Sequence, residues 1–140
     1  RCTNNYGPRQ FEEKLIPKII LSANKNKKIP IYGTGKNIRD WIFVSDHCNA
    51  LLKVLLKGKK GESYNISGSN EISNIKIVKK ILKIMKKPEK LIEITDDRLG
   101  HDFRYSMDSS KIKNKLKWKP KISFEQGLEL TIKWYLERGW

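Results

Sequence analysis

Four arginines stand in polar, glycine-containing segments where a guanidinium group could bind an anion: Arg9, Arg39, Arg98 and Arg104. A guanidinium fork forms parallel, charge-assisted hydrogen bonds with a phosphate or a carboxylate. Arginine is scarce in this chain, because Lys+Arg is 30 and only six of these residues are Arg. The positions of the arginines are therefore more informative than the overall basic charge.

The familiar catalytic motifs are absent from the sequence. Gly35-Lys36 is followed by Asn37 instead of Ser or Thr, which excludes a Walker phosphate loop, and Ile38 replaces the third glycine of a dinucleotide fingerprint. Tyr32 and Lys36 have Tyr-x-x-x-Lys spacing, but two glycines lie between them, so we expect a strand and turn instead of a helix. The two histidines and two cysteines fit no zinc spacing.

Four polar segments are the strongest candidates for a binding site. Each combines Asn, Asp or Gly with aromatic or basic residues, and each alone could be an ordinary structured loop. Their joint occurrence favours a site. They are Thr3–Gln10, Pro30–Trp41, Tyr64–Glu71 and Asp97–Tyr105.

The elements that must position these segments alternate between strands and helices. The hydrophobic spacing predicts short strands over 29–32, 41–44, 63–66 and 91–95. It predicts helices that begin near Pro17, at Ser45 or Asp46, at Ser73 or Asn74, at Asp108 and at Ser123. This alternation indicates an α/β fold. Several strands are short enough to be edge pieces that need a partner domain.

Two of these helices carry specific expectations. The helix from Ser45 or Asp46 should carry Ala50, Leu51, Val54 and Leu55 and end before Gly58. In the last helix, Ser123 and Gln126 have the spacing of a capping box, in which side chain and backbone cap each other reciprocally.

The formal net charge of +15 raises the possibility of a nucleic-acid-binding module. Most lysines alternate with Ile and Leu, as in the segment 76–83, which favours the solvated face of amphipathic helices. We therefore expect no nucleic-acid partner, and the basic module stays as an alternative. No apolar run approaches membrane-spanning length, and two cysteines form no disulfide framework, which favours the cytoplasm.

The four segments, in this order, closely resemble the C-terminal part of the dTDP-glucose 4,6-dehydratases, a family of the extended short-chain dehydrogenase/reductase superfamily. Asn-Asn-Tyr-Gly-Pro and Arg-Asp-Trp-Ile resemble the superfamily, and Arg98-Leu99-Gly100-His101-Asp102 with Arg104-Tyr105 resembles the dehydratases. The resemblance implies that residues 1–140 form the nucleotide-sugar-binding lobe, with elements that return to a Rossmann sheet. The N-terminal NAD-binding Rossmann domain would be absent from this chain.

The resemblance also implies site residues. Asn5 would approach the nicotinamide end of NAD. Pro30, Ile31 and Tyr32 would form the base pocket, Arg39 and Arg98 would hold the diphosphate, and 97–101 would close over the nucleotide. Leu99 stands where the family usually has Pro, which loosens this loop. The implied substrate-binding residues are Asn4, Lys14, Leu15, Pro30, Ile31, Tyr32, Arg39, Asn74, Asp97, Arg98, Leu99, Gly100 and His101.

Simpler structural roles remain open for four of these residues. Arg39 could pair with Asp40 or Asp46, and Tyr32 could belong to the core. Asn74 could be only a helix cap, because Asn is favoured at that position. His101 could be a hydrogen-bonding loop residue with no ligand.

In the family, NAD accepts a hydride from C4 of the glucose, water is lost across C5 and C6, and the hydride returns to C6. The resemblance places the Tyr–Lys and Asp–Glu pairs for these steps upstream of Arg1, so we expect the isolated chain to be inactive. We also expect the full-length protein to form a homodimer. The alternatives are another nucleotide-sugar enzyme (a UDP-sugar dehydratase, epimerase or decarboxylase), or an inactive interaction fragment marked by exposed apolar helix faces.

Overall fold

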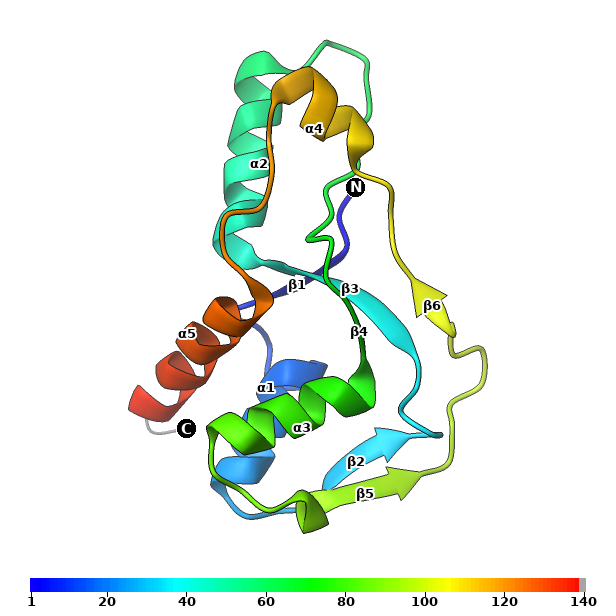
Figure 1. The fold of residues 1–140 in the computed structure, drawn as a ribbon, viewed down its shortest axis with the longest axis vertical. Helices are drawn as coiled ribbons and strands as arrows, with labels where there is room; N and C mark the ends of the chain where they lie inside the picture. Colours follow the sequence, from blue (N-terminus) through cyan, green and yellow to red (C-terminus); the bar gives the residue numbers. More distant parts are fainter. Residues whose placement is uncertain (139–140) are drawn as a thin grey trace.

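The computed structural model describes residues 1–138, and residues 139–140, the end of the expected lobe, lie outside the described part. Strands and helices alternate, which confirms the α/β fold (Figure 1). The helices are α1 (Leu15–Asn24), α2 (Val44–Lys57), α3 (Asn74–Ile84), the 3₁₀ turn η1 (Glu89–Leu91), α4 (Ser110–Leu116) and α5 (Phe124–Glu137). The strands are β1 (Asn4–Tyr6), β2 (Ile29–Tyr32), β3 (Ile38–Phe43), β4 (Glu71–Ser73), β5 (Ile92–Thr95) and β6 (Arg104–Tyr105).

The strands form two small sheets. In the first, β3 pairs in parallel with β1 and β6 and antiparallel with β4. In the second, β2 and β5 are parallel, with Ile31 opposite Ile94. A separate parallel bridge joins Cys2 to Ile66, where a longer strand over 63–66 was expected. The carboxyl end of β2 and the start of β3 are therefore adjacent through the turn at 33–37.

Two hydrophobic clusters support the fold. In the larger one, α1, α3 and α5 bury their apolar faces against β1, β2 and β3, with Ile20, Ile81 and Phe124 almost fully inaccessible. In the smaller one, α2 and α4 pack around residues 1–3 and 64–66 through Ala50, Ile66 and Ile112. Figure 1 shows α1 and α3 in the lower part of the molecule and α2 and α4 in the upper part.

The helix starts predicted at Ser73 or Asn74 and at Ser123 are confirmed, including the capping box of Ser123 and Gln126. The other three starts are displaced. Helix α4 begins at Ser110, with Ser109 at the N-cap position where Asp108 was expected. Helix α1 begins at Leu15, with Pro17 in its first turn, where a missing backbone N–H costs little. Helix α2 begins at Val44, and Asp46 is no cap, because its buried Oδ2 accepts the backbone N–H groups of Lys121 and Ile122 at 3.0 and 2.9 Å.

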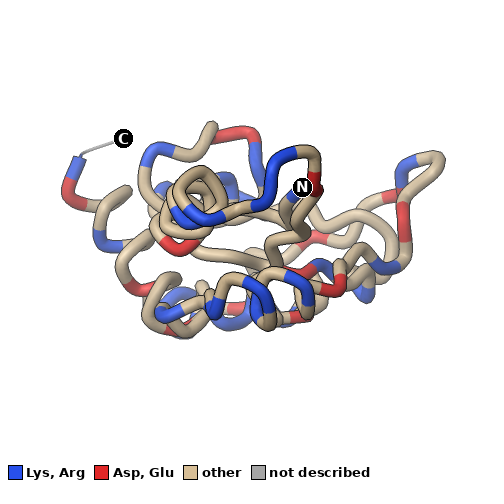
Figure 2. The backbone as a smooth tube through the Cα atoms, turned by 90° about the horizontal axis from the view of Figure 1, so that it is seen from above, with Lys and Arg blue, Asp and Glu red and all other residues tan. Residues whose placement is uncertain are grey.

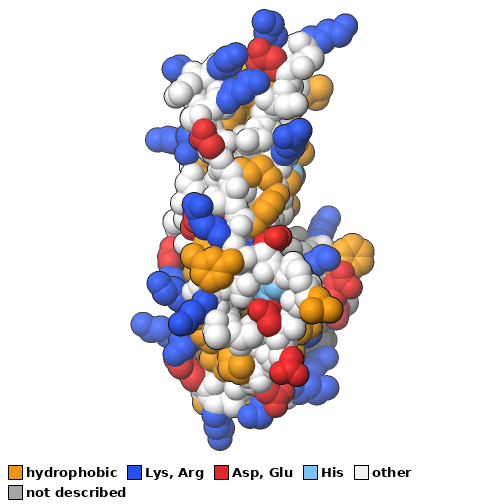
Figure 3. Space-filling view, turned by 90° about the vertical axis from the view of Figure 1, so that its right-hand side faces the viewer, with side chains coloured by type: hydrophobic (Ala, Val, Ile, Leu, Met, Phe, Trp, Pro, Cys, Tyr) orange, Lys and Arg blue, Asp and Glu red, His pale blue; other side chains and the backbone are white. Residues whose placement is uncertain are grey.

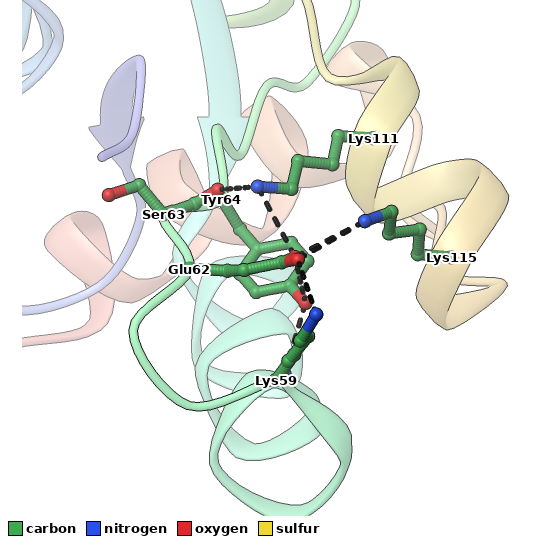
Figure 4. Close-up of polar contacts among 6 residues, drawn as sticks. All are labelled: Lys59, Glu62, Ser63, Tyr64, Lys111 and Lys115. Atoms are coloured by element: carbon green, nitrogen blue, oxygen red, sulfur yellow. Dashed lines mark hydrogen bonds and ion pairs between the residues drawn. The ribbon is translucent and has the colours of Figure 1, made fainter.

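Glu62 connects the loop after α2 to helix α4 through ion pairs and a hydrogen bond. Its carboxylate lies 3.3 Å from the Lys115 ammonium, 3.4 Å from that of Lys111 and 3.9 Å from that of Lys59, and it accepts a hydrogen bond from the Tyr64 hydroxyl (Figure 4). Three cations around one carboxylate form a network instead of an isolated surface pair. This network therefore fixes α4 against the end of α2.

Lysines and arginines are spread along most of the chain and alternate with acidic residues (Figure 2). Several are paired, as in Lys79–Glu89 and Lys80–Glu125. The face that carries β6 shows basic side chains scattered between small groups of exposed hydrophobic side chains (Figure 3). Within residues 1–138, no helix is long and apolar enough to cross a membrane, and no group of three or more His, Cys, Asp or Glu side chains could hold a metal ion.

Candidate functional site

A cleft of about 340 Å³ lies where the end of β2, the middle of β3 and the starts of α1 and α3 meet. It collects side chains from segments that are far apart in the sequence. Ten of the expected substrate-binding residues line it, whereas Asp97, Leu99 and Gly100 do not, and neither does Asn5. The lining residues are Asn4, Glu13, Lys14, Leu15, Lys18, Pro30, Ile31, Tyr32, Arg39, Trp41, Asn74, Arg98 and His101.

Arg39 is the most unusual residue of this cleft, because it is buried (8% exposed) without a counter-ion. Its Nη1 donates to the carbonyl oxygen of Ile38 at 2.7 Å, and its Nη2 to that of Asp102 at 2.8 Å. Among residues 1–138 no carboxylate lies within 4.0 Å of it. A buried charge without a partner is costly, so this arrangement favours an anionic ligand.

The two carboxylates that could have paired with Arg39 are used elsewhere, so that interpretation is wrong. Asp40 accepts the backbone N–H groups of Gly68 and Asn70 at 3.1 and 2.6 Å. Asp46 accepts those of Lys121 and Ile122. Arg39 therefore lines the cleft, and its hydrogen bonds within the described residues go to backbone carbonyl oxygens.

A folded loop brings Arg98 and His101 to the rim. One Asp97 carboxylate oxygen accepts the backbone N–H of Arg98 at 2.9 Å and lies 2.7 Å from Nδ1 of His101. The hydrogen bond from His101 is the main reason why the pKa of Asp97 is held below its usual value. His101 is thus a hydrogen-bonding loop residue, as the simpler interpretation expected, and it also lines the cleft.

Tyr32 lies beside this loop and is not a core residue. It is 46% exposed, and the His101 ring meets it edge to face, with centroids 6.5 Å apart. Gly33 follows with φ +56°, and a Cβ there would come within 2.7 Å of the Asp97 carboxylate, so the close approach of turn and loop requires glycine. An exposed ring beside Arg39 and Arg98 is suited to a planar group attached to an anion.

Asn74 is the first residue of α3, and its side chain caps nothing, so the interpretation as a simple cap is wrong. Its Oδ1 is buried without a hydrogen-bond partner among the described residues. The backbone N–H groups of Asn74 and Ile75 donate to the carbonyl oxygens of Asn37 and Gly35. The first two amides of α3 are therefore occupied, and the side chain of Asn74 is what remains for a ligand.

Three cleft residues were not predicted: Glu13, Lys18 and Trp41. Lys18 lies one helical turn after Lys14, and Trp41 lies two residues after Arg39 on the same side of β3. Both could have been found from these spacings. The indole Nε1 of Trp41 is buried without a partner among residues 1–138.

Asn5 lies outside the cleft on β1. Its Nδ2 donates to the sulfur of Cys2 and to the carbonyl oxygen of Thr3, whereas its Oδ1 is buried without a donor in the described chain. A buried acceptor of this kind usually has a partner, so Asn5 could accept an N–H from a bound group.

The cleft thus combines a buried guanidinium without a carboxylate partner in the described chain, a second arginine and an exposed aromatic ring, on an α/β fold. This chemistry is suited to an anion that carries a ring. A family model described as GDP-mannose 4,6 dehydratase matches residues 1–131. The chain belongs to this family.

Among curated relatives, the dTDP-glucose 4,6-dehydratase of Escherichia coli is 51% identical over 146 residues, covering 96% of this chain and 40% of the relative. The Neisseria gonorrhoeae enzyme of the same name is 49% identical, with 97% and 42% covered. The chain therefore spans about two fifths of the length of the relatives that it matches.

Solved structures agree with this relationship. The Bacillus anthracis dTDP-glucose 4,6-dehydratase in complex with NAD has a TM-score of 0.95 and 48% identity, covering 99% of this chain and 44% of that one. The Thermotoga maritima UDP-glucose 4-epimerase with UDP-glucose has a TM-score of 0.93 but only 28% identity, with 99% and 45% covered. The fold is therefore shared with epimerases, and the higher identities are with the dehydratases.

Proposed function

We propose that this chain is the substrate-binding part of an NAD-dependent dTDP-glucose 4,6-dehydratase, which converts dTDP-glucose to dTDP-4-keto-6-deoxyglucose with loss of water. The identities near 50% to dehydratases of that name support the substrate class. The observation that carries the proposal is Arg39, a buried cation that faces the cleft without a carboxylate within residues 1–138.

In this proposal the diphosphate lies between Arg39 and Arg98, and the thymine lies against Tyr32, Pro30 and Ile31. Charge-assisted hydrogen bonds from two guanidinium groups suit a doubly charged diphosphate. Lys14 and Lys18 add positive charge to the same cleft. Asn4, Leu15 and Asn74 complete the contacts, and the loop 97–101 closes over the nucleotide.

Asn5 is the one residue of this chain expected to contact NAD, and its surroundings fit this role. Its buried Oδ1 has no donor in the described chain, and the N–H of the nicotinamide carboxamide could supply one. When bound, NAD supplies the hydride acceptor and donor of the reaction. In this proposal Asn5 would orient the nicotinamide carboxamide, and the rest of the cofactor would be bound by a domain outside this chain.

We further propose that the 140-residue chain alone does not turn over substrate, because the expected Tyr–Lys and Asp–Glu pairs are not among its residues. Formation of the 4-keto product by the purified chain would refute this. The full-length protein is proposed to be a cytoplasmic homodimer.

The proposed function is tested by titrating the isotope-labelled chain with dTDP and following the indole N–H of Trp41 by NMR. We expect saturable binding weaker than micromolar, because only part of the site is present. The R98A variant should bind about 10- to 100-fold more weakly, since a hydrogen bond to a charged group contributes about 1.5–3 kcal/mol. Arg98 is exposed, so the fold should be unaffected.

R104A is the matched control, because Arg104 pairs with Glu71 and does not line the cleft. Its affinity for dTDP should equal that of the wild-type chain. Equal losses in R98A and R104A, or sub-micromolar binding by the wild-type chain, would contradict the proposal.

The nearest alternative is a UDP-sugar enzyme, because an epimerase shares the fold at 28% identity. Burying the thymine methyl group should favour dTDP over UDP about fourfold, since one buried carbon contributes about 0.8 kcal/mol. Equal or tighter binding of UDP would favour the alternative. A nucleic-acid module would instead bind duplex DNA with an affinity that falls steeply with salt, and we propose that no such binding occurs.

A further inference from the structure

Trp41 lines the cleft and carries a hydrogen-bond donor that nothing in the described chain satisfies. The residue is 3% exposed, and its indole Nε1 is buried without a partner among residues 1–138. A buried indole N–H usually has an acceptor, because a buried donor left unpaired is costly. A bound molecule is therefore a natural source of the acceptor for this N–H.

The position of Trp41 is fixed from several sides. Its backbone N–H donates to the carbonyl oxygen of Asn70 at 3.1 Å, and a Cβ on Gly68 would come within 1.8 Å of its carbonyl oxygen. The ring of Tyr6 meets the indole edge to face, with ring centroids 6.2 Å apart. An indole packed this closely has little freedom to turn toward another acceptor.

The place of Trp41 along β3 indicates which part of a ligand its N–H would meet. In the proposed function the base lies against Tyr32 at the end of β2, and the diphosphate meets Arg39 near the start of β3. Trp41 follows Arg39 by two residues on the same side of β3, which places it about 6.5 Å further from the end of β2. The group attached to the far end of the diphosphate would therefore lie beside Trp41.

A second polar side chain lies next to the indole. Asn4 of β1 is the register partner of Trp41 in the parallel pair, and it also lines the cleft. Paired residues of neighbouring strands have their side chains on the same face of the sheet. An indole donor beside a carboxamide, which both donates and accepts, suits the hydroxyl and ring oxygens of a sugar.

We infer that the indole N–H of Trp41 is a further substrate-binding group, which donates to an oxygen at the hexose end of the bound nucleotide sugar. This oxygen belongs to the hexose or to the phosphate that carries it. The inference rests on the proposed function and deepens it, because Trp41 distinguishes a nucleotide that has this end from one that stops at its first phosphate.

The structural alternative is a weak contact of the Nε1–H with the face of the Tyr6 ring. In that case the N–H has its partner within the chain, and a nucleotide would leave it unchanged. The two interpretations therefore differ in how Trp41 responds to a ligand.

The test compares the binding of dTMP, dTDP and dTDP-glucose to the wild-type chain and to W41F by NMR titration of the backbone amides. Phe keeps an aromatic ring and removes the N–H. We expect W41F to bind dTDP-glucose about 10-fold more weakly, because one hydrogen bond is lost, and to bind dTMP with unchanged affinity. A loss for dTDP-glucose alone supports a hexose oxygen as the acceptor, and a loss for dTDP as well supports an oxygen of the second phosphate. No loss for dTDP-glucose, or an equal loss for dTMP, would overturn the inference.

W118F is the matched control. Trp118 is 5% exposed, belongs to the smaller cluster and does not line the cleft, so its replacement by Phe removes the same atoms away from the ligand. Its affinity for all three nucleotides should equal that of the wild-type chain. Equal weakening of dTDP-glucose binding in W118F and W41F would show a general packing effect and would overturn the inference.

A measurement on the wild-type chain avoids dependence on how W41F folds. When dTDP-glucose binds, the indole N–H resonance of Trp41 should move downfield and its exchange with deuterium should slow, whereas the resonance of Trp118 should not change. An unchanged Trp41 resonance while the backbone amides of the cleft reach saturation would overturn the inference. Failure of the proposed function is distinguishable, because in that case no amide of the wild-type chain would saturate with dTDP or dTDP-glucose.

Discussion

The two hydrophobic clusters of this chain are built from similar residues but differ in how completely they are enclosed. In the larger cluster, three helices cover the strands, and side chains such as Ile20, Ile81 and Leu82 are fully inaccessible. In the smaller cluster, α2 and the short helix α4 enclose few residues, and α2 leaves four leucines in solvent. The larger cluster is therefore enclosed on more sides than the smaller one, whose helix α2 keeps an apolar face in solvent.

The cleft lies in the more completely enclosed half of the chain. Its walls come from β2, β3 and the first turns of α1 and α3, which all belong to the enclosed half. Binding residues are thus held by a packed core, as precise positioning of a charged ligand requires. In the smaller cluster, neither α2 nor α4 contributes a residue to the cleft.

The largest expected effect compares one substitution in the two clusters. Ile81 and Ile112 are both inaccessible, in the larger and smaller cluster respectively. An Ile→Ala change costs about 2–5 kcal/mol, and the cost rises when the surroundings cannot relax. We expect I81A to lose about 4 kcal/mol of the free energy of unfolding and I112A about 2 kcal/mol, as measured by urea denaturation.

Leu55→Ala is the control for this comparison, because Leu55 is 80% exposed. It should change the free energy of unfolding by less than about 0.5 kcal/mol. Equal losses in I81A and I112A would show that the smaller cluster is as well supported as the larger one.

Helix α2 also shows how far the sequence could predict this fold. Its helical spacing and its end at Gly58 are confirmed. Its residues Leu51 and Leu55 are exposed, because periodicity identifies an apolar face but burial depends on what packs against it. The N-cap at Ser45 or Asp46 failed for a similar reason, since the Asp46 carboxylate binds a segment 75 residues away.

The site could be predicted in part from local patterns. Arg39 and Trp41 alternate on one side of β3, and the turn after Tyr32 was evident from its glycines. Arg98 and Arg39 line the same cleft although 59 positions separate them (98 − 39 = 59), a juxtaposition that no local spacing contains and only the family resemblance implied. That Arg39 lacks a carboxylate within residues 1–138 could be seen only in the structure.

A smaller effect on the free energy of unfolding is expected where α2 of the smaller cluster contacts the segment before α5. Asp46 on α2 accepts two backbone N–H groups from the segment that precedes α5, and it is 2% exposed. D46A leaves two partly buried N–H groups without their acceptor, which should cost about 1–2 kcal/mol, whereas D46N keeps an acceptor oxygen and should lose less. Two separate unfolding transitions in D46A would show that this carboxylate couples the clusters.

The control is D108A, because the exposed Asp108 carboxylate also accepts a backbone N–H, but its hydrogen bonds within residues 1–138 are only to the nearby Ser110. Its free energy of unfolding should fall by less than that of D46A. If D108A were as destabilising, the loss in D46A would reflect helix capping and not the coupling of the two clusters.

The smallest expected effect concerns the Glu62 network of the smaller cluster. Partial desolvation acts to raise the pKa of Glu62, but hydrogen bonds from Lys115, Lys111 and Tyr64 outweigh it, so its pKa is lowered. A carboxyl whose pKa is depressed on folding adds stability at neutral pH, and this contribution is lost as the pH falls through its folded pKa. The melting temperature of E62Q should therefore be slightly below that of the wild-type chain at pH 7.

This difference should shrink as the pH falls below the ordinary range for a glutamate, and in high salt, which screens exposed ion pairs. The E89Q variant is the control, because Glu89 pairs with Lys79 alone, in the enclosed half. Amide hydrogen exchange in α4 should become faster in E62Q and stay unchanged in E89Q. A pH-independent difference would mean that Glu62 acts through packing, and that its charge does not hold α4 against α2.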